Sequence, residues 1–145
     1  MVRKITHITI HSSASTFGDA HLIREWHKAR GWLDIGYHFV IMNGWTRKNI
    51  LIESLDGSVS DGRPLDMKPA SVKGHNTGHI AIVMIGDGEF TDKQMGSLFK
   101  LVNNLRLKFG VELHSIRGHY EYDSGKLCPQ IDMKAFRKLL GKTHG

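Results

Sequence analysis

The segment Ile80-Ala81-Ile82-Val83-Met84-Ile85 is a nearly pure apolar run of the length of one strand. A strand that is apolar on both faces is typical of the middle of a sheet whose two faces are covered. The run therefore predicts a central strand, and the rest of the chain is expected to supply the neighbouring strands and the covering helices.

Four further segments are expected to be strands, and a fifth is expected to be a long loop. Ile5 to His11 alternates and ends on a histidine, while Tyr37 to Met42 and Ile50 to Leu55 are short apolar runs that suit buried strands. Another short strand is expected at Glu112 to Ile116. Between Asp56 and Gly78 the Gly, Pro, Ser and Lys residues indicate a long surface loop, and such loops are often functional.

Three helices are expected, and Asp19, Thr91 (with Gln94 in a capping box) and Asp132 are suited to begin them. The second is expected to end near Gly110. The first helix should end at Gly31 and carry His21 and His27 on its polar face. Its buried face is expected to be an apolar stripe of Leu22, Ile23, Trp26 and Ala29. Strands interleaved with helices predict an α/β fold with a central mixed β-sheet flanked by helices.

Length and composition indicate one domain that spans residues 1–145, with no separate binding module. The chain has 145 residues, is 40% hydrophobic, and contains no apolar run near the ~20 residues of a membrane span. Its start, Met1-Val2-Arg3-Lys4, leads directly into a strand, so we expect no signal peptide and synthesis in a cytoplasm. A formal charge of +6 suits a polyanionic partner: nucleic acid, an anionic membrane or the cell wall.

The segment from Arg117 to Pro129 places chemically active residues close together. It contains His119, Lys126 and the only cysteine, Cys128, and the first predicted strand ends on His11. Two imidazoles and a thiolate are three good zinc ligands, which leave a fourth position for a water. The Lys126 ammonium would favour the thiolate that a metal requires. A thiol hydrolase with Cys128 as nucleophile and His119 as base is the alternative.

The stretch Gly31-Trp32-Leu33-Asp34-Ile35-Gly36-Tyr37-His38-Phe39-Val40-Ile41 resembles a strand of the zinc-dependent N-acetylmuramoyl-L-alanine amidases. This family includes phage lysozyme-type amidases, bacterial muropeptide amidases and animal peptidoglycan recognition proteins. Further matches follow in the family's order: Gly62-Arg63-Pro64-Leu65, Gly74-His75-Asn76, the apolar strand to Gly86-Asp87, the Thr91 helix and Cys128-Pro129. The likeness covers nearly the whole chain and is nearest to short phage endolysins made of the catalytic domain alone.

The resemblance implies the fold of this family and one Zn²⁺ per chain, held by His11, His119 and Cys128. It also implies Tyr37 and Lys126 as catalytic partners. The other matching residues are expected to contact substrate or support the ligands: His38, His75 and Asn76. Cysteine rather than aspartate as third ligand favours the phage and recognition-protein branch. One departure is Ser71, which stands near the place where many relatives carry a histidine.

The implied activity is hydrolysis of the amide between N-acetylmuramic acid and L-alanine in peptidoglycan, which lyses the bacterial host. We expect a monomer that waits in the host cytoplasm until a holin opens the inner membrane and then acts on periplasmic peptidoglycan. The alternatives are a bacterial muropeptide-recycling amidase and an amidase that also binds and inhibits a phage RNA polymerase. A nucleic-acid-binding protein is the rival from another class, because the chain is basic.

Overall fold

The computed structural model describes residues 3–142, and its five strands form one mixed sheet in the order β3-β2-β4-β1-β5. The strands are β1 (His7–Ser12), β2 (Phe39–Arg47), β3 (Ile50–Asp61), β4 (His79–Met84) and β5 (Ile116–Gly118). Strand β4 is parallel to both β1 and β2, β1 is parallel to β5, and β2 and β3 pair antiparallel. The apolar run thus forms the middle strand, as predicted.

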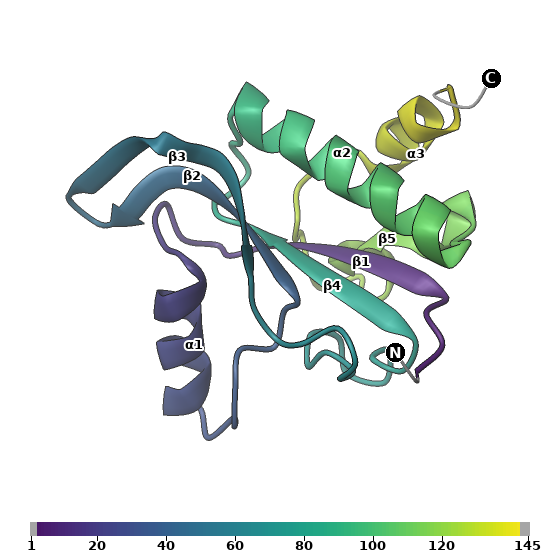
Figure 1. The fold of residues 1–145 in the computed structure, drawn as a ribbon, viewed down its shortest axis with the longest axis horizontal. Helices are drawn as coiled ribbons and strands as arrows, with labels where there is room; N and C mark the ends of the chain where they lie inside the picture. Colours follow the sequence, from purple (N-terminus) through teal and green to yellow (C-terminus); the bar gives the residue numbers. More distant parts are fainter. Residues whose placement is uncertain (1–2, 143–145) are drawn as a thin grey trace.

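Three helices cover the sheet on both faces: α1 (Ala20–Ala29), α2 (Asp92–Phe109) and α3 (Met133–Lys142). Figure 1 shows α2 and α3 together on one side of the sheet and α1 on the other. The main core lies under α2 and α3 and includes fully buried Ile8, Ile10, Ile82, Leu98 and Val102. A smaller core lies under α1. The prediction of an α/β fold with a mixed sheet flanked by helices is confirmed.

The helix boundaries follow the predicted caps. The Asp19 and Asp132 carboxylates each accept a hydrogen bond from the backbone N–H three residues on, at 2.8 and 3.0 Å. Thr91 and Gln94 form the reciprocal capping box, and Gly110 ends α2 in the left-handed conformation at φ 67°. Local hydrogen bonding therefore fixes these ends as the sequence indicated.

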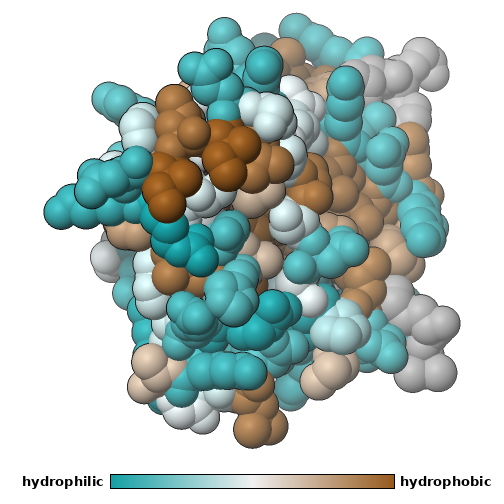
Figure 2. Space-filling view, turned by 60° about the vertical axis from the view of Figure 1, so that its left-hand side comes forward, coloured by the Kyte–Doolittle hydropathy of each residue, from teal (hydrophilic) through white to brown (hydrophobic). Residues whose placement is uncertain are grey.

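The expectation that Ile50 to Leu55 is a buried strand is wrong. Strand β3 continues to Asp61, so the long loop begins at residue 62, and β2 contacts β4 only over Phe39–Ile41. Past Ile41, β2 pairs only with β3, so the two strands extend from β4 as a two-stranded ribbon, seen at the left of Figure 1. Several apolar side chains are consequently exposed: Trp45, Ile50, Leu51 and Ile52. Figure 2 shows hydrophobic side chains gathered on this side of the molecule.

Two other predictions also need correction. Leu113–Ser115 is a short 3₁₀-helix, and the strand begins only at Ile116, because β1 offers pairing partners to Ile116–Gly118 alone. In α1, Ala29 is exposed and His27 is buried. His27 lies four residues after Ile23, so helical periodicity places both on the face toward the sheet.

The pleat of β1 decides where the functional side chains lie. Ile8 and Ile10 point into the core under α2 and α3. The alternate residues His7, Thr9 and His11 therefore point to the opposite face, the one that α1 covers only in part (Figure 1). Within residues 3–142, no helix combines the length and the apolar character needed to span a bilayer.

Candidate metal centre

His11 occupies the penultimate position of β1 and is almost fully buried, with 1% of its surface exposed. Its Nε2 has no hydrogen-bond partner among the described residues, and its Nδ1 lies 3.9 Å from the Cys128 sulfur. Burial, together with the neighbouring His119 and His79, lowers the pKa of His11 to about 3. The ring is thus neutral, which a metal ligand requires, and it lacks the hydrogen bonds that buried nitrogens normally make.

Cys128 reaches the same point from the loop before α3. The backbone N–H of Ser12 donates to its sulfur at 3.0 Å, which fixes the thiol against the end of β1. Burial raises the pKa of Cys128, while the contacts with Ser12 and the charge of Lys126 partly offset this. In the absence of a cation the thiol is therefore protonated, and a bound metal ion would be needed to stabilise the thiolate.

His119 follows β5 directly and begins a short 3₁₀-helix, η2 (His119–Glu121). Its ring meets that of His11 edge to face, with 4.9 Å between the ring centroids. Burial lowers the pKa of His119, and the Lys126 ammonium lowers it further. The second imidazole is therefore also held neutral beside the first.

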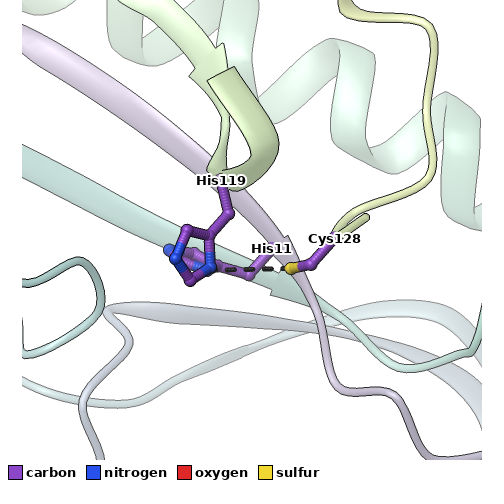
Figure 3. A group of neighbouring side chains, drawn as sticks. All are labelled: His11, His119 and Cys128. Carbon is purple, nitrogen blue, oxygen red and sulfur yellow. Dashed lines mark hydrogen bonds between the residues drawn. The ribbon is translucent and has the colours of Figure 1, made fainter. Parts of the chain in front are cut away.

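The three side chains converge from β1, η2 and the loop before α3, as Figure 3 shows. One candidate ligand atom from each residue, His11, His119 and Cys128, lies within 4.8 Å of the other two. Tetrahedral zinc with bonds of about 2.0–2.3 Å holds its ligand atoms about 3.4–3.6 Å apart, so small side-chain rotations suffice to close the site. The donor set and the unpartnered His11 nitrogen both fit a zinc ion.

Tyr37 lies against the candidate metal ligand His11, with 5.1 Å between the ring centroids. Burial, with a smaller contribution from the nearby Cys128, raises its pKa to about 12. The phenol is therefore a hydrogen-bond donor at neutral pH and not a base. Lys126 is exposed in the loop between His119 and Cys128, and it influences both of them electrostatically.

Comparison with known proteins identifies the relatives of this arrangement. The sequence model described as N-acetylmuramoyl-L-alanine amidase matches residues 1–131. The chain belongs to this amidase family. The endolysin of Escherichia phage T7 is 36% identical over 120 residues, which cover 77% of this chain and 70% of the phage protein. The endolysin of Klebsiella phage KP32 is 31% identical over 134 residues, or 85% and 79% of the two chains.

Solved structures of amidases share the fold. N-acetylmuramoyl-L-alanine amidase LysC from Clostridium intestinale superposes with a TM-score of 0.80 at 25% identity, over 96% of this chain and 87% of LysC. Drosophila PGRP-LB superposes with a TM-score of 0.71 at 22% identity, over 98% and 83% of the two chains. The predicted family and its fold are therefore confirmed.

The amidase uses two of the other predicted site residues as structural supports. His38 is buried, accepts a hydrogen bond from the Ala81 N–H at 3.0 Å and contacts the Met67 carbonyl at 2.7 Å. Asn76 accepts hydrogen bonds from the backbone N–H groups of Ser71 and Val72 at 2.9 and 3.1 Å. These contacts hold strands and a loop together and do not join the three candidate ligands.

His75, the third of these residues, is exposed and packs on Tyr122, with 4.7 Å between ring centroids. Tyr122 lies three residues after His119, so His75 borders the site through this ring. Tyr122 is half-buried. Sequence reasoning did not single it out, because one tyrosine in a loop carries no periodic signal.

His27 was also missed as part of this amidase site. Its Nδ1 accepts the backbone N–H of Gly36 at 2.8 Å, directly before Tyr37, and its ring packs against Tyr37 and Trp32. Burial lowers the pKa of His27 to about 4, so the ring is a neutral acceptor. Its spacing of four from Ile23 was the sequence signal that could have placed it on the buried face.

Proposed function

We propose that this amidase is a zinc enzyme and that His11, His119 and Cys128 hold the ion. The observation that carries the proposal is the convergence of two neutral imidazoles and one buried thiol, with one candidate ligand atom of each within 4.8 Å of the others. Peptidoglycan is the substrate of the family to which the chain belongs. The phage relatives favour an endolysin over a muropeptide-recycling enzyme.

Zinc bound at this site would supply a Lewis acid and would lower the pKa of its water toward ~7. The protein's contribution is to orient the amide between N-acetylmuramic acid and L-alanine and to stabilise charge. We assign to the Tyr37 hydroxyl the role of a donor beside the attacked carbonyl, since its pKa of about 12 keeps it protonated. We assign to the Lys126 ammonium the stabilisation of the oxyanion that develops there.

The thiol-hydrolase alternative is disfavoured by the environment of Cys128. A nucleophilic cysteine needs a lowered pKa, whereas burial raises the pKa of this one. The backbone N–H of Ser12 points at the sulfur and fixes it beside His11, where it can ligate. The surroundings therefore suit a metal ligand better than an attacking group.

A chelation experiment separates the two chemistries. Removal of metal by a chelator followed by dialysis should abolish release of L-alanine-terminated stem peptides from purified peptidoglycan, and one equivalent of Zn²⁺ should restore it. Mg²⁺ should not restore the activity, because it prefers oxygen ligands. Activity that survives complete metal removal would rule out the zinc proposal and favour the thiol mechanism.

Substitution of the proposed zinc ligands tests whether the ion binds at this site. Cys128→Ala and His119→Ala should each reduce bound zinc well below one per chain, whereas Lys138→Ala, on the exposed side of α3, should retain it. Full zinc occupancy in both ligand variants would contradict the assignment.

We further propose that the enzyme acts as a single-domain monomer, is made in the host cytoplasm and reaches the wall after a holin opens the inner membrane. The phage endolysin relatives support this proposal. Endolysin-dependent lysis that proceeds at full speed without any holin would contradict the proposed route.

A further inference from the structure

A row of polar side chains leads away from the metal site along the sheet face opposite the main core. His7, Thr9 and His11 share this face on β1, and Thr9 pairs with Arg117 of β5. Paired residues of parallel strands point to the same side of a sheet, so Arg117 joins the row. The face under α2 and α3, by contrast, carries isoleucines.

The ring of Tyr122 is the centre of this row. Arg117 places its guanidinium carbon 5.7 Å from the Tyr122 ring centroid, and His75 and His79 lie with ring centroids 4.7 and 5.7 Å away. His7 stacks on His79 in parallel, at 4.6 Å and 3°. Five aromatic or cationic side chains thus form one connected cluster beside the metal site.

Arg117 has no carboxylate partner within the described part of the chain. Its Nε donates to the backbone carbonyl of His114 at 2.9 Å, and its terminal nitrogens make no described hydrogen bond. The nearby acid Glu121 is held by two contacts from Arg137, at 2.7 and 2.9 Å. Glu112 contacts His114 instead, at 3.3 Å. The terminal nitrogens of this partly exposed guanidinium are therefore available to bind a carboxylate of a ligand.

The positive charge of Arg117 acts on the neighbouring His7. Burial lowers the pKa of His7, and the charges of Arg117, His114 and His75 lower it further. Such a field attracts an anion, and a planar guanidinium suits a carboxylate because two parallel N–H groups match its two oxygens.

The distance from the metal site agrees with a peptide in the substrate. Arg117 lies one strand away from β1 and two residues back from His11, which places the two Cα atoms about 8 Å apart. An extended peptide advances about 3.3–3.6 Å per residue. A side chain or terminal carboxylate on the second or third residue of a stem peptide can therefore reach the guanidinium.

We propose that Arg117, with Tyr122, His7 and His75 around it, forms a subsite that binds a free carboxylate of the stem peptide. The enzyme thereby discriminates stem peptides with free carboxylates from those in which the carboxylates are amidated. The inference rests on the proposed function, because it takes the cleaved bond to lie at His11, His119 and Cys128.

The test uses two soluble N-acetylmuramoyl tripeptides that differ only in whether the second and third residues carry carboxylates or carboxamides. The wild-type enzyme should cleave the acid form with about a ten-fold lower KM. Arg117→Gln, which keeps polar contacts but removes the charge, should raise the KM for the acid form until the two values agree within two-fold. Arg117→Lys should restore part of the preference.

Lys138→Gln is the matched control, because it removes one exposed positive charge from α3, on the other side of the sheet (Figure 1). It should keep the wild-type preference. A preference that Arg117→Gln leaves unchanged would overturn the subsite. So would an equal rate loss on both substrates, which would indicate a structural role. Wild-type enzyme that cleaves neither tripeptide would instead contradict the proposed function, and the subsite with it.

Discussion

The proposed role of Cys128 as a metal ligand depends on neighbours that are over a hundred residues away in the chain. Its sulfur accepts the Ser12 N–H and lies 3.9 Å from a His11 nitrogen. Residue types alone suggested these three side chains as zinc ligands but left a thiol hydrolase as the alternative, because a lone cysteine and ten histidines leave many combinations. The family resemblance then favoured the zinc site. His27 shows what the sequence alone does not predict. Its helical spacing could have indicated a buried position, but its hydrogen bond from the Gly36 N–H depends on how the loop after α1 folds back.

At the residue scale, Tyr37→Phe removes only the hydroxyl, to which we assign the role of a hydrogen-bond donor beside the substrate carbonyl. Because the ring still packs on His11, we expect zinc content to stay at one per chain while kcat falls about 10²-fold. Steady-state kinetics on a soluble muropeptide, together with metal analysis, measure both quantities. A variant with wild-type kcat would remove Tyr37 from the mechanism, and a variant without zinc would make its role structural.

At the element scale, the fold was predictable where local chemistry decides it. The apolar run of β4 and the caps at Asp19 and Thr91 act within a few residues, and all three were correctly predicted. The β2–β3 ribbon was not, because an apolar run does not reveal whether a neighbouring strand will cover it. β4 pairs with only three residues of β2, so Ile50–Leu55 of β3 lies in the part of the ribbon that extends past β4.

Gln94 connects α2 to the sheet more firmly than its capping role alone would require. It is fully buried, and its Nε2 donates to the carbonyls of Ile41 and Ile85 at 3.2 and 2.8 Å. Gln94→Ala should therefore lower the free energy of unfolding by about 2–4 kcal/mol, since it deletes these bonds and half of the capping box. Urea denaturation measures this loss, and exposed Asn104→Ala on the same helix should change it by less than about 0.5 kcal/mol. Equal stability of the two variants would show that Gln94 does not anchor α2.

At the scale of the whole molecule, buried histidines make the stability depend on pH. Burial lowers the pKa values of His27, His38 and His79 to about 4. The unfolded chain binds protons at these groups near pH 6.5, whereas the folded chain does not. Stability should therefore be lost as the pH falls from about 6.5 toward 4, by at most about 4 kcal/mol per pH unit for three groups.

Urea unfolding of the metal-free enzyme between pH 8 and pH 4 checks this behaviour. The free energy of unfolding should be nearly level above pH 7 and should fall below it. A level value from pH 7 down to pH 4.5 would mean that the three histidines accept protons in the folded state.

The proposed metal site depends on all three scales, because one residue from a strand, one from a short helix and one from a loop must meet to form it. X-ray absorption at the zinc edge of the purified enzyme tests this most directly. We predict one zinc per chain, with one sulfur neighbour at about 2.3 Å and nitrogen neighbours at about 2.0–2.1 Å. A zinc shell without sulfur, or a protein that binds no zinc, would contradict the assignment of His11, His119 and Cys128.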